Sequence, residues 1–364
     1  MKKISIPLFV IVVLAAAWLG VSWYSGQRAQ AVIGEGVARL NNAWSKSDPQ
    51  RLGLQIKPVS YQRGLLSTHA RYALSANALP EGQAPEMDLT IWHGPFPHGL
   101  TPKRFALHAE LATTGFVKEV ADAAMKGQSP LAFDLECAYD DHCAFSGGVP
   151  AVEYTVPIAQ IKLAFGGMQM KANALWHSET DYQMDGSAQI LPLSVNGEDF
   201  GDGQWVFSST AQKVDESFSW KTGAGESKVS MAVALTQPID HNKVAAFKTP
   251  EETVTFLAGL VNTASMKISL SKPMLVDIGA HATHLIRSAD PIAARQQISE
   301  QLDALTSSPE ASGFIQVKDD TITSDWQYAG GKLTINGQDH SDLLAQIKNS
   351  SQRAMQAQKN PTGQ

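Results

Sequence analysis

The sequence predicts an α+β protein, in which an N-terminal transmembrane helix is followed by an elongated, mostly antiparallel β-sheet body with helices packed on one face. Three observations support this class. Residues 4–24 carry no charged side chain, the chain between residues 51 and 240 alternates in hydropathy with a period of two, and helical spacing of apolar residues returns after Pro238. Because the strands are joined by short turns, we expect antiparallel pairing with one apolar face.

Residues 4–24 predict a membrane anchor. At about 1.5 Å of rise per residue they cover roughly 32 Å, close to the ~30 Å hydrocarbon core of a bilayer. Trp18, Trp23 and Tyr24 gather at the far end, where aromatic rings favour the membrane interface. The alternative is a cleaved signal peptide, whose apolar core is usually about 7–15 residues long. We expect the longer run to be retained. The Lys and Arg residues near its two ends do not set its orientation.

The composition argues against one class of partner. The formal net charge is −6 at pH 7 and charged residues make up 18% of the chain. A nucleic-acid partner needs a basic face, so we expect none. No basic run follows the anchor, which argues against a patch for anionic lipid headgroups.

The chain has two cysteines, Cys137 and Cys143. Their spacing can close a short loop between two strands, and in an oxidising periplasm we expect a disulfide. Free thiols are one alternative. The other is a metal site in which Asp140, Asp141 or His142 joins both thiolates, although zinc sites usually have closer cysteine pairs and four well-defined ligands.

A juxtamembrane helix is predicted directly after the anchor. Ile33, Val37, Leu40 and Trp44 are spaced by four, three and four residues and form one narrow apolar stripe. Packing of this stripe on the body is one interpretation. The other is pairing with the same helix of a second copy, which the anchor would hold in parallel, and it predicts a homodimer.

The predicted organisation has five parts. They are a cytoplasmic tip with the transmembrane anchor (1–27), the juxtamembrane helix (28–50), an antiparallel β-rich region (51–240), a mixed helix and strand region of the same body (241–340), and a polar C-terminal helix with a tail (341–364). Within the mixed region, 243–263 and 291–306 have helical patterns, and 267–276 is strand-like.

The β-rich region predicts a sheet with an apolar face that carries Met168, Met170, Met231 and several aromatic side chains. Such a face is suited to line a groove for acyl chains or a peptide. The alternative is an ordinary core, covered by the helices predicted at 243–263 and 291–306.

No catalytic, cofactor or metal site is predicted. His93, Phe96 and His98 are the binding-site candidates, since the two histidines flank a segment with two prolines. A rigid corner that ends a strand explains the same segment without catalysis, because proline donates no ladder hydrogen bond. His281 and His284 lie three residues apart without an evident third ligand, which favours two separate histidines over a metal site. Nucleophile-elbow and phosphate-loop motifs are absent, which argues against an enzyme.

Four segments together resemble the YdgA-like family of Gram-negative envelope proteins, a family without an assigned activity. They are YQRGLLS (61–67), HGPFP (93–97), VNGEDFGDG (195–203), and DTIT (320–323) with YAGGKLTING (328–337). Their order and spacing fit from the anchor to about Leu344. The resemblance implies a single-pass protein of the inner membrane with its body in the periplasm and a homodimeric state. It supplies no catalytic residue.

The sequence therefore predicts a non-catalytic, inner-membrane-anchored periplasmic protein that interacts with envelope components. One alternative is a periplasmic protein that binds a lipid or another hydrophobic ligand. A second is a membrane-anchored envelope hydrolase that uses His93 and His98. The partners expected are the inner membrane, a second copy of the chain, and an envelope protein or lipid.

Overall fold

The computed structural model describes residues 22–346 with gaps. The residues outside this description are 1–21, 23, 25, 28–29, 32, 43, 46–51, 78–83, 95, 98–100, 158–159, 179, 241–242, 245–246, 248–249, 345 and 347–364. The predicted anchor falls almost entirely outside the described residues, as do the end of the predicted C-terminal helix and the tail. Among the residues that are described, no helix has both the length and the apolar character needed to cross a membrane.

The described chain divides into two compact units, one ending at Trp176 and the other beginning at His177. The first unit contains an antiparallel sheet in the order β1-β2-β3-β4-β5-β6-β9. These strands are β1 (Gln55–Arg63), β2 (Ser67–Ser75), β3 (Glu86–His93), β4 (Phe105–Leu111), β5 (Ala132–Cys137), β6 (His142–Val149) and β9 (Met168–Ser178). β7 (Val152–Val156) and β8 (Ile161–Phe165) pair with each other.

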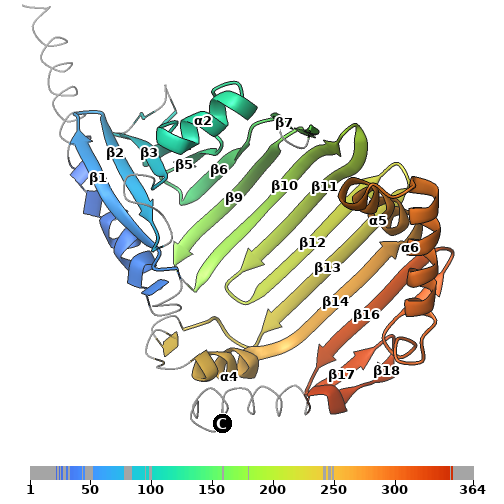
Figure 1. Cartoon of the computed structure of the whole chain (residues 1–364). Helices are drawn as coiled ribbons and strands as arrows, with labels where there is room; N and C mark the ends of the chain where they lie inside the picture. Colours follow the sequence, from blue (N-terminus) through green and yellow to red (C-terminus); the bar gives the residue numbers. More distant parts are fainter. Residues whose placement is uncertain are drawn as a thin grey trace, which may run out of the picture. The chain divides into compact units, whose positions relative to one another are not determined.

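Two helices belong to the first unit (Figure 1). The first covers described residues between 22 and 45, and its Asn41 side chain reaches the edge of β1. There the amide Nδ2 donates to the Ile56 carbonyl at 2.9 Å, and Oδ1 accepts from the Ile56 N–H at 2.8 Å. The side chain thus pairs with an edge strand as a neighbouring strand would. The second helix, α2 (Gly115–Ala124), buries Ala121 and Ala124.

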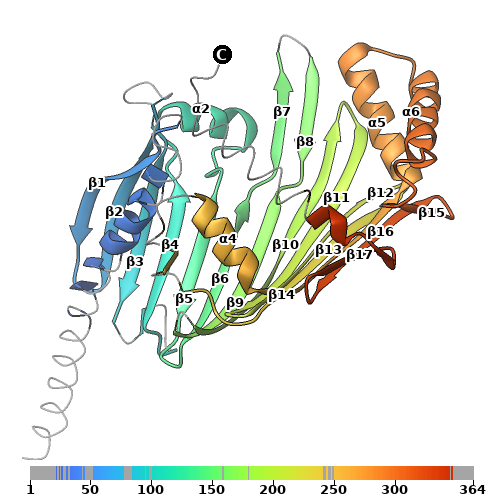
Figure 2. The same ribbon diagram turned by 90° about the horizontal axis from the view of Figure 1, so that it is seen from below.

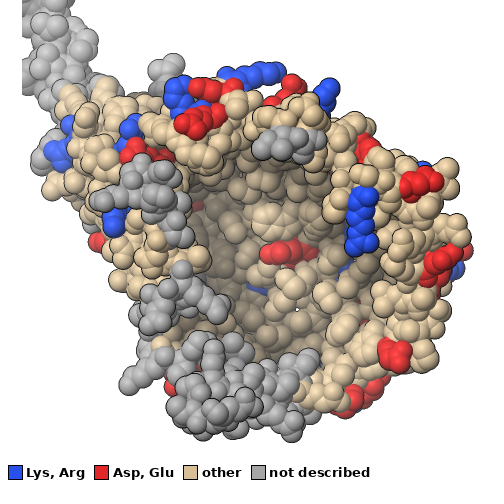
Figure 3. Space-filling model, viewed as in Figure 1, with Lys and Arg blue, Asp and Glu red and all other residues tan. Residues whose placement is uncertain are grey.

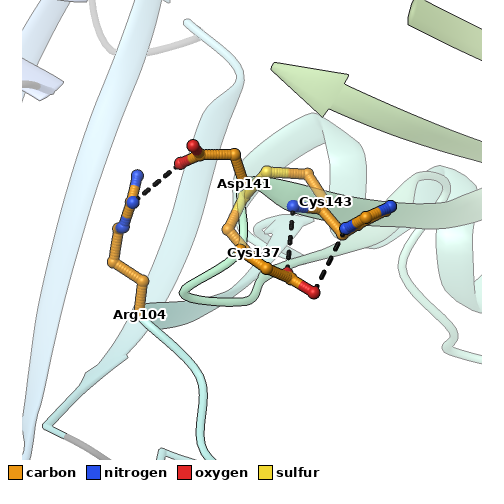
Figure 4. The surroundings of a disulfide bond; sticks show 6 residues. Arg104, Cys137, Asp141 and Cys143 are labelled. Carbon is orange, nitrogen blue, oxygen red and sulfur yellow. Dashed lines mark hydrogen bonds and ion pairs between the residues drawn. A yellow bond between two sulfur atoms is a disulfide. The ribbon is translucent and has the colours of Figure 1, made fainter. Parts of the chain in front are cut away.

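The predicted disulfide is present in the first unit (Figure 4). Cys137 at the end of β5 lies directly opposite Cys143 in β6, so the cross-strand register brings the two sulfur atoms together. The Arg104 guanidinium donates to the Asp141 carboxylate at 2.8 Å beside the turn. The metal alternative does not apply to these cysteines, because a disulfide sulfur is no longer a thiolate ligand.

The second unit contains an antiparallel sheet in the order β10-β11-β12-β13-β14-β16-β17-β18, with the short β15 also on β16. These strands are β10 (Asp181–Val195), β11 (Glu198–Thr210), β12 (Lys213–Thr222), β13 (Gly225–Leu235), β14 (Val261–Ser271), β15 (Gln316–Lys318), β16 (Thr321–Ala329), β17 (Lys332–Ile335) and β18 (Gln338–Asp339). Together, the two units confirm the α+β class with mostly antiparallel strands.

Three helices flank the sheet of the second unit (Figure 2). They are α4 (Pro250–Leu260), α5 (Lys272–Arg287) and α6 (Pro291–Thr306). α6 has the predicted bounds, because Asp290 caps it by accepting from the Ile292 N–H at 3.1 Å and Pro291 occupies its first turn. α5 packs against α6 where Gly279 faces Ile298.

Two sequence predictions were wrong around β14. The helix predicted over 243–263 ends at Leu260, and Val261 already pairs with Leu235 of β13. The strand predicted over 267–276 ends at Ser271, whose hydroxyl accepts from the Met274 N–H and caps α5. Pro273 lies in the first turn of that helix, where its missing N–H costs nothing. Ser271 followed by Pro273 is therefore the helix-start signal in this segment. The prediction missed it because the alternating pattern of β14 continues past Ser271.

Candidate functional site

The sheet of the second unit has one strongly apolar face. The register from β10 to β16 places its large apolar side chains at directly opposed positions, so they share one side of the sheet. We call this side the apolar face. Its large side chains are Met184, Ile190, Trp205, Phe207, Val214, Phe218, Trp220, Val229, Met231, Val233, Met266, Ile268, Trp326 and Tyr328.

The opposite side of the same sheet is polar. The row that crosses the strands at Asp185 runs through Ser208, Asp215, Ala232 and Ser265. Ion pairs join Lys213 to Asp215 at 2.7 Å and Lys267 to Asp325 at 3.7 Å on this side. One side of the sheet thus carries polar residues that water can solvate, and the other side carries the apolar residues. This division is typical of a sheet with one face on a core.

The apolar face nevertheless remains partly open. Phe218 is 38% exposed and Met231 42% exposed, although both lie in central strands. Their neighbours Trp205, Phe207 and Val229 are half-buried. The surface over β11–β14 in Figure 3 is hollowed and mostly uncharged. Exposed apolar area of this kind is typical of a binding surface.

Aromatic side chains are concentrated on β11 and β12. The rings of Trp205 and Phe207 lie 4.8 Å apart, and those of Phe218 and Trp220 are stacked at 6.1 Å. The Trp220 indole donates to the Phe200 carbonyl at 2.7 Å, which fixes its orientation. The rings thus form an apolar platform on β11 and β12, in which the hydrogen bond fixes the Trp220 indole.

Glu216 is the charged side chain of this platform. It lies directly opposite Phe207 on β11 and Met231 on β13, and it is half-buried. The side chains directly opposite it on this face are apolar, and the described residues supply no hydrogen bond or ion pair to its carboxylate. Glu216 could not be singled out from the sequence, because its place among apolar neighbours depends on the strand register.

The ends of the apolar face are covered by local structure. His281 of α5 contacts the Phe200 ring at 5.8 Å, and its Nδ1 lies 3.3 Å from the Asp199 carbonyl. At the other side of the sheet, the Phe314 ring lies 6.1 Å from Trp326. Phe200 and Trp326 are half-buried by these contacts, whereas Phe218 and Met231 in the centre of the sheet are exposed.

The described residues contain no cluster of three metal-ligating side chains. His281 and His284 have separate surroundings, since the Nδ1 of His284 lies 2.7 Å from the Ala289 carbonyl. Met168 and Met170 lie half-buried on β9 in the first unit, whereas Met231 lies on β13 in the second. The three methionines that the sequence analysis grouped on one apolar face therefore belong to two units.

His93 ends β3 in the first unit and is only 2% exposed. Its Nε2 lies 3.3 Å from the Thr68 hydroxyl. Ser22 is fully buried at the same place, and a Cβ on Gly26 would come within 2.8 Å of the His93 ring. The small residues Ser22 and Gly26 let their helix approach the corner that His93 begins. We call these contacts the helix–corner junction.

His93 is buried, as expected for a rigid corner that ends a strand. Phe96 is 46% exposed. His98 lies outside the described residues, so the predicted pair of His93 and His98 stays a prediction. A ring with 2% exposure offers no open surface to a substrate.

The pKa of His93 is lowered, chiefly because burial disfavours the imidazolium, while the backbone groups of Ser22 and Ser67 partly oppose this shift. The unfolded chain takes up a proton near the usual pKa of about 6.5, where the native protein does not. The native state is therefore destabilised relative to the unfolded chain as the pH falls from about 6.5 towards the lowered pKa. Above about pH 6.5 His93 is neutral in both states, and this destabilisation is absent.

The expected result is that His93→Gln reduces the loss of unfolding free energy between pH 7 and pH 5.5. Urea titrations at several pH values measure this slope. The exposed His177 provides the control, and His177→Gln should retain the slope of the parent protein. An unchanged slope in His93→Gln would contradict the buried neutral state.

The stripe predicted for dimerisation lies on the first helix. Ile33, Val37 and Trp44 are half-buried, while Leu40 is 47% exposed. Asn41 attaches this helix to β1, so packing on the body is observed at that point. The pairing of two copies stays a prediction.

Comparison with known proteins identifies the family. The model of the family described as "Bacterial protein of unknown function (DUF945)" matches residues 1–217 and 213–341. Protein YdgA of Escherichia coli is 24% identical over 210 residues, which cover 54% of this chain and 39% of that protein. The uncharacterized Escherichia coli protein YihF is 22% identical over 250 residues, covering 65% of this chain and 51% of YihF.

An uncharacterized protein of Haemophilus influenzae is 28% identical over 98 residues, which cover 27% of each chain. The chain thus spans about half the length, or less, of the curated relatives it matches. The similarity to YdgA confirms the resemblance found in the sequence. The chain belongs to the DUF945 family of bacterial proteins of unknown function.

Proposed function

We propose that this chain is a non-catalytic, membrane-anchored periplasmic protein whose apolar face binds an acyl chain. The observation that carries the proposal is the exposure of Phe218 and Met231 in the centre of a sheet whose other side is polar. The proposed site lies in the second unit, and the proposed ligand is a lipid of the envelope.

Energetics favour an occupant of this face. Covering apolar surface contributes about 25 cal/mol per Å², so a face of many half-exposed large side chains binds a linear apolar molecule without directional hydrogen bonds. The face extends across β10–β14 and β16, which at about 4.8 Å per strand interval gives roughly 24 Å. Met184, Met231 and Met266 add flexible side chains that adapt to different chains.

The proposed location rests on the sequence. Residues 4–24 have the length and the interfacial aromatic residues of an anchor. The disulfide between Cys137 and Cys143 fits an oxidising compartment. An anchor places the body next to the membrane, which is the source of the proposed ligand. Single cysteines introduced into exposed turns test the location: labelling of intact cells by an impermeant thiol reagent supports it, and labelling only after lysis contradicts it.

A homodimer through the first helix is part of the proposal. Exposed Leu40 and half-buried Ile33 and Val37 face one side at helical spacing. Crosslinking of the membrane-bound protein tests this pairing, and an unaltered crosslink in a Leu40→Glu variant would argue against it.

Mass spectrometry of the full chain tests the binding function. We expect lipid to remain bound after gentle extraction and to be released on unfolding. Protein without bound lipid across several mild extractions, together with no uptake of added fatty acid, would exclude the acyl-chain function.

A further inference from the structure

Glu216 places a negative charge near the centre of the apolar face. The residue lies between Phe207 and Met231 on the neighbouring strands, and Phe218 follows two positions later on the same side. Glu216 is half-buried, and the surface over β11–β14 in Figure 3 is largely uncharged. The carboxylate is therefore accessible, and the side chains that surround it are apolar or aromatic.

A carboxylate surrounded by aromatic side chains is suited to bind a positively charged group. A carboxylate forms its strongest hydrogen bonds with charged donors, and the faces of aromatic rings attract cations as well. Trp205 and Phe207, whose rings lie 4.8 Å apart, stand on the strand next to Glu216, and Phe218 is directly opposite Trp205. The carboxylate and the rings are thus placed to act on the same positively charged group.

We propose that the ligand of the apolar face is an amphiphile with an ammonium group, and that Glu216 binds this group. The inference rests on the proposed acyl-chain function and adds a head-group preference to it. The apolar part of the ligand lies along the sheet, while its ammonium group lies beside Glu216. A carboxylate or sulfate head group is repelled at the same place, and a neutral head group gains no ionic interaction.

A different role for Glu216 makes a different prediction. Inward-facing charges on open sheets also prevent association between sheets. In that case Glu216→Gln promotes self-association and has no specific effect on ligands of one charge. The two roles are separated by comparing ligands that share one chain and differ in charge.

The experiment uses the full chain held in a non-ionic amphipol at pH 7. Dodecylamine, 1-dodecanol and dodecanoate, each below its micellar concentration, compete with a fluorescent fatty-acyl probe. We expect dodecylamine to bind about tenfold more tightly than 1-dodecanol, and dodecanoate to bind most weakly. In Glu216→Gln the advantage of the amine should disappear, with dodecanol binding unchanged.

Asp215→Asn supplies the matched control, because Asp215 precedes Glu216 and lies on the polar side, where it pairs with Lys213. This variant should keep the tenfold preference. Equal binding of amine and alcohol by the parent protein, or a preference that survives in Glu216→Gln, overturns the role of Glu216 and leaves acyl-chain binding intact. Failure of all three compounds to displace the probe overturns both proposals.

Discussion

Replacement of Gly94 by alanine is expected to lower the free energy of unfolding by about 4 kcal/mol. Gly94 follows His93 at the helix–corner junction and has a φ of +109°, which L-residues rarely adopt. A Cβ at this position would lie 2.3 Å from the Ser22 hydroxyl oxygen. Backbone strain of about 1–3 kcal/mol and overpacking of about 1–3 kcal/mol therefore act together. Urea denaturation of the full chain, followed by circular dichroism, measures the loss.

A second glycine separates the two causes. Gly331, in the turn between β16 and β17, has a φ of +81°, but a Cβ there meets no atom within 4 Å. Gly331→Ala should therefore cost only the backbone strain, about 1–2 kcal/mol. Adding Ser22→Gly to Gly94→Ala should recover part of the stability by removing the clashing hydroxyl. Equal losses at both glycines, with no recovery, would show that the junction is not tightly packed.

Replacement of Phe218 and Met231 together by glutamine is expected to weaken binding of a fatty-acyl probe by tenfold or more. Full burial of such a side chain contributes about 1.5–3 kcal/mol, and somewhat over a third of each remains exposed for a ligand to cover. The two losses add to about 1.2–2.4 kcal/mol, a range that includes the roughly 1.4 kcal/mol of a tenfold change, and covering the two glutamine amides with an apolar chain adds a desolvation cost. The fold should persist, because both side chains are already open to solvent. Fluorescence titration of the full chain provides the measurement.

Val206 offers a control of equal exposure on the opposite side of the sheet. It is 43% exposed, and it follows Trp205 along β11 but points to the polar side. Val206→Gln should leave probe affinity unchanged, so that a general effect of glutamine on the sheet is excluded. If Val206→Gln weakens binding as much as the double variant does, the ligand does not occupy the apolar face.

Much of the local structure could be predicted from the sequence. The Gly330-Gly331 pair between two alternating runs is a hairpin signal in the sequence, and both glycines have positive φ values, +56° and +81°, in the turn between β16 and β17. α6 was predicted with its observed bounds, since a proline at its first residue and a preceding aspartate are strong start signals. These features depend on a few adjacent residues, which a single sequence displays.

Features that depend on distant residues could not be predicted. β6 pairs with β9 across the β7–β8 hairpin, and β14 pairs with β16 across α5 and α6. Neither pairing leaves a signal in local periodicity, because an alternating strand fits many neighbours. The boundary between β14 and α5 was predicted wrongly for a related reason, since the alternation of apolar residues continues past Ser271.

The site shows the same division. The sequence predicted an apolar sheet face that carries Met231 and several aromatic side chains, because apolar residues such as Val229, Met231 and Val233 recur at every second position. The register was needed to place Glu216 beside Phe207, and only the packing of the helices shows that Met231 stays exposed. His93 was a candidate for chemistry in the sequence, yet burial against Ser22 and Thr68 makes it part of a junction.

Photocrosslinking in intact cells shows directly whether a lipid occupies the apolar face. A photoreactive amino acid is placed at position 231 on the apolar face or at position 206 on the polar side, and the purified chain is weighed by mass spectrometry after illumination. We expect lipid adducts at position 231 and none at position 206. Absence of lipid at position 231, or equal labelling at both positions, would contradict it.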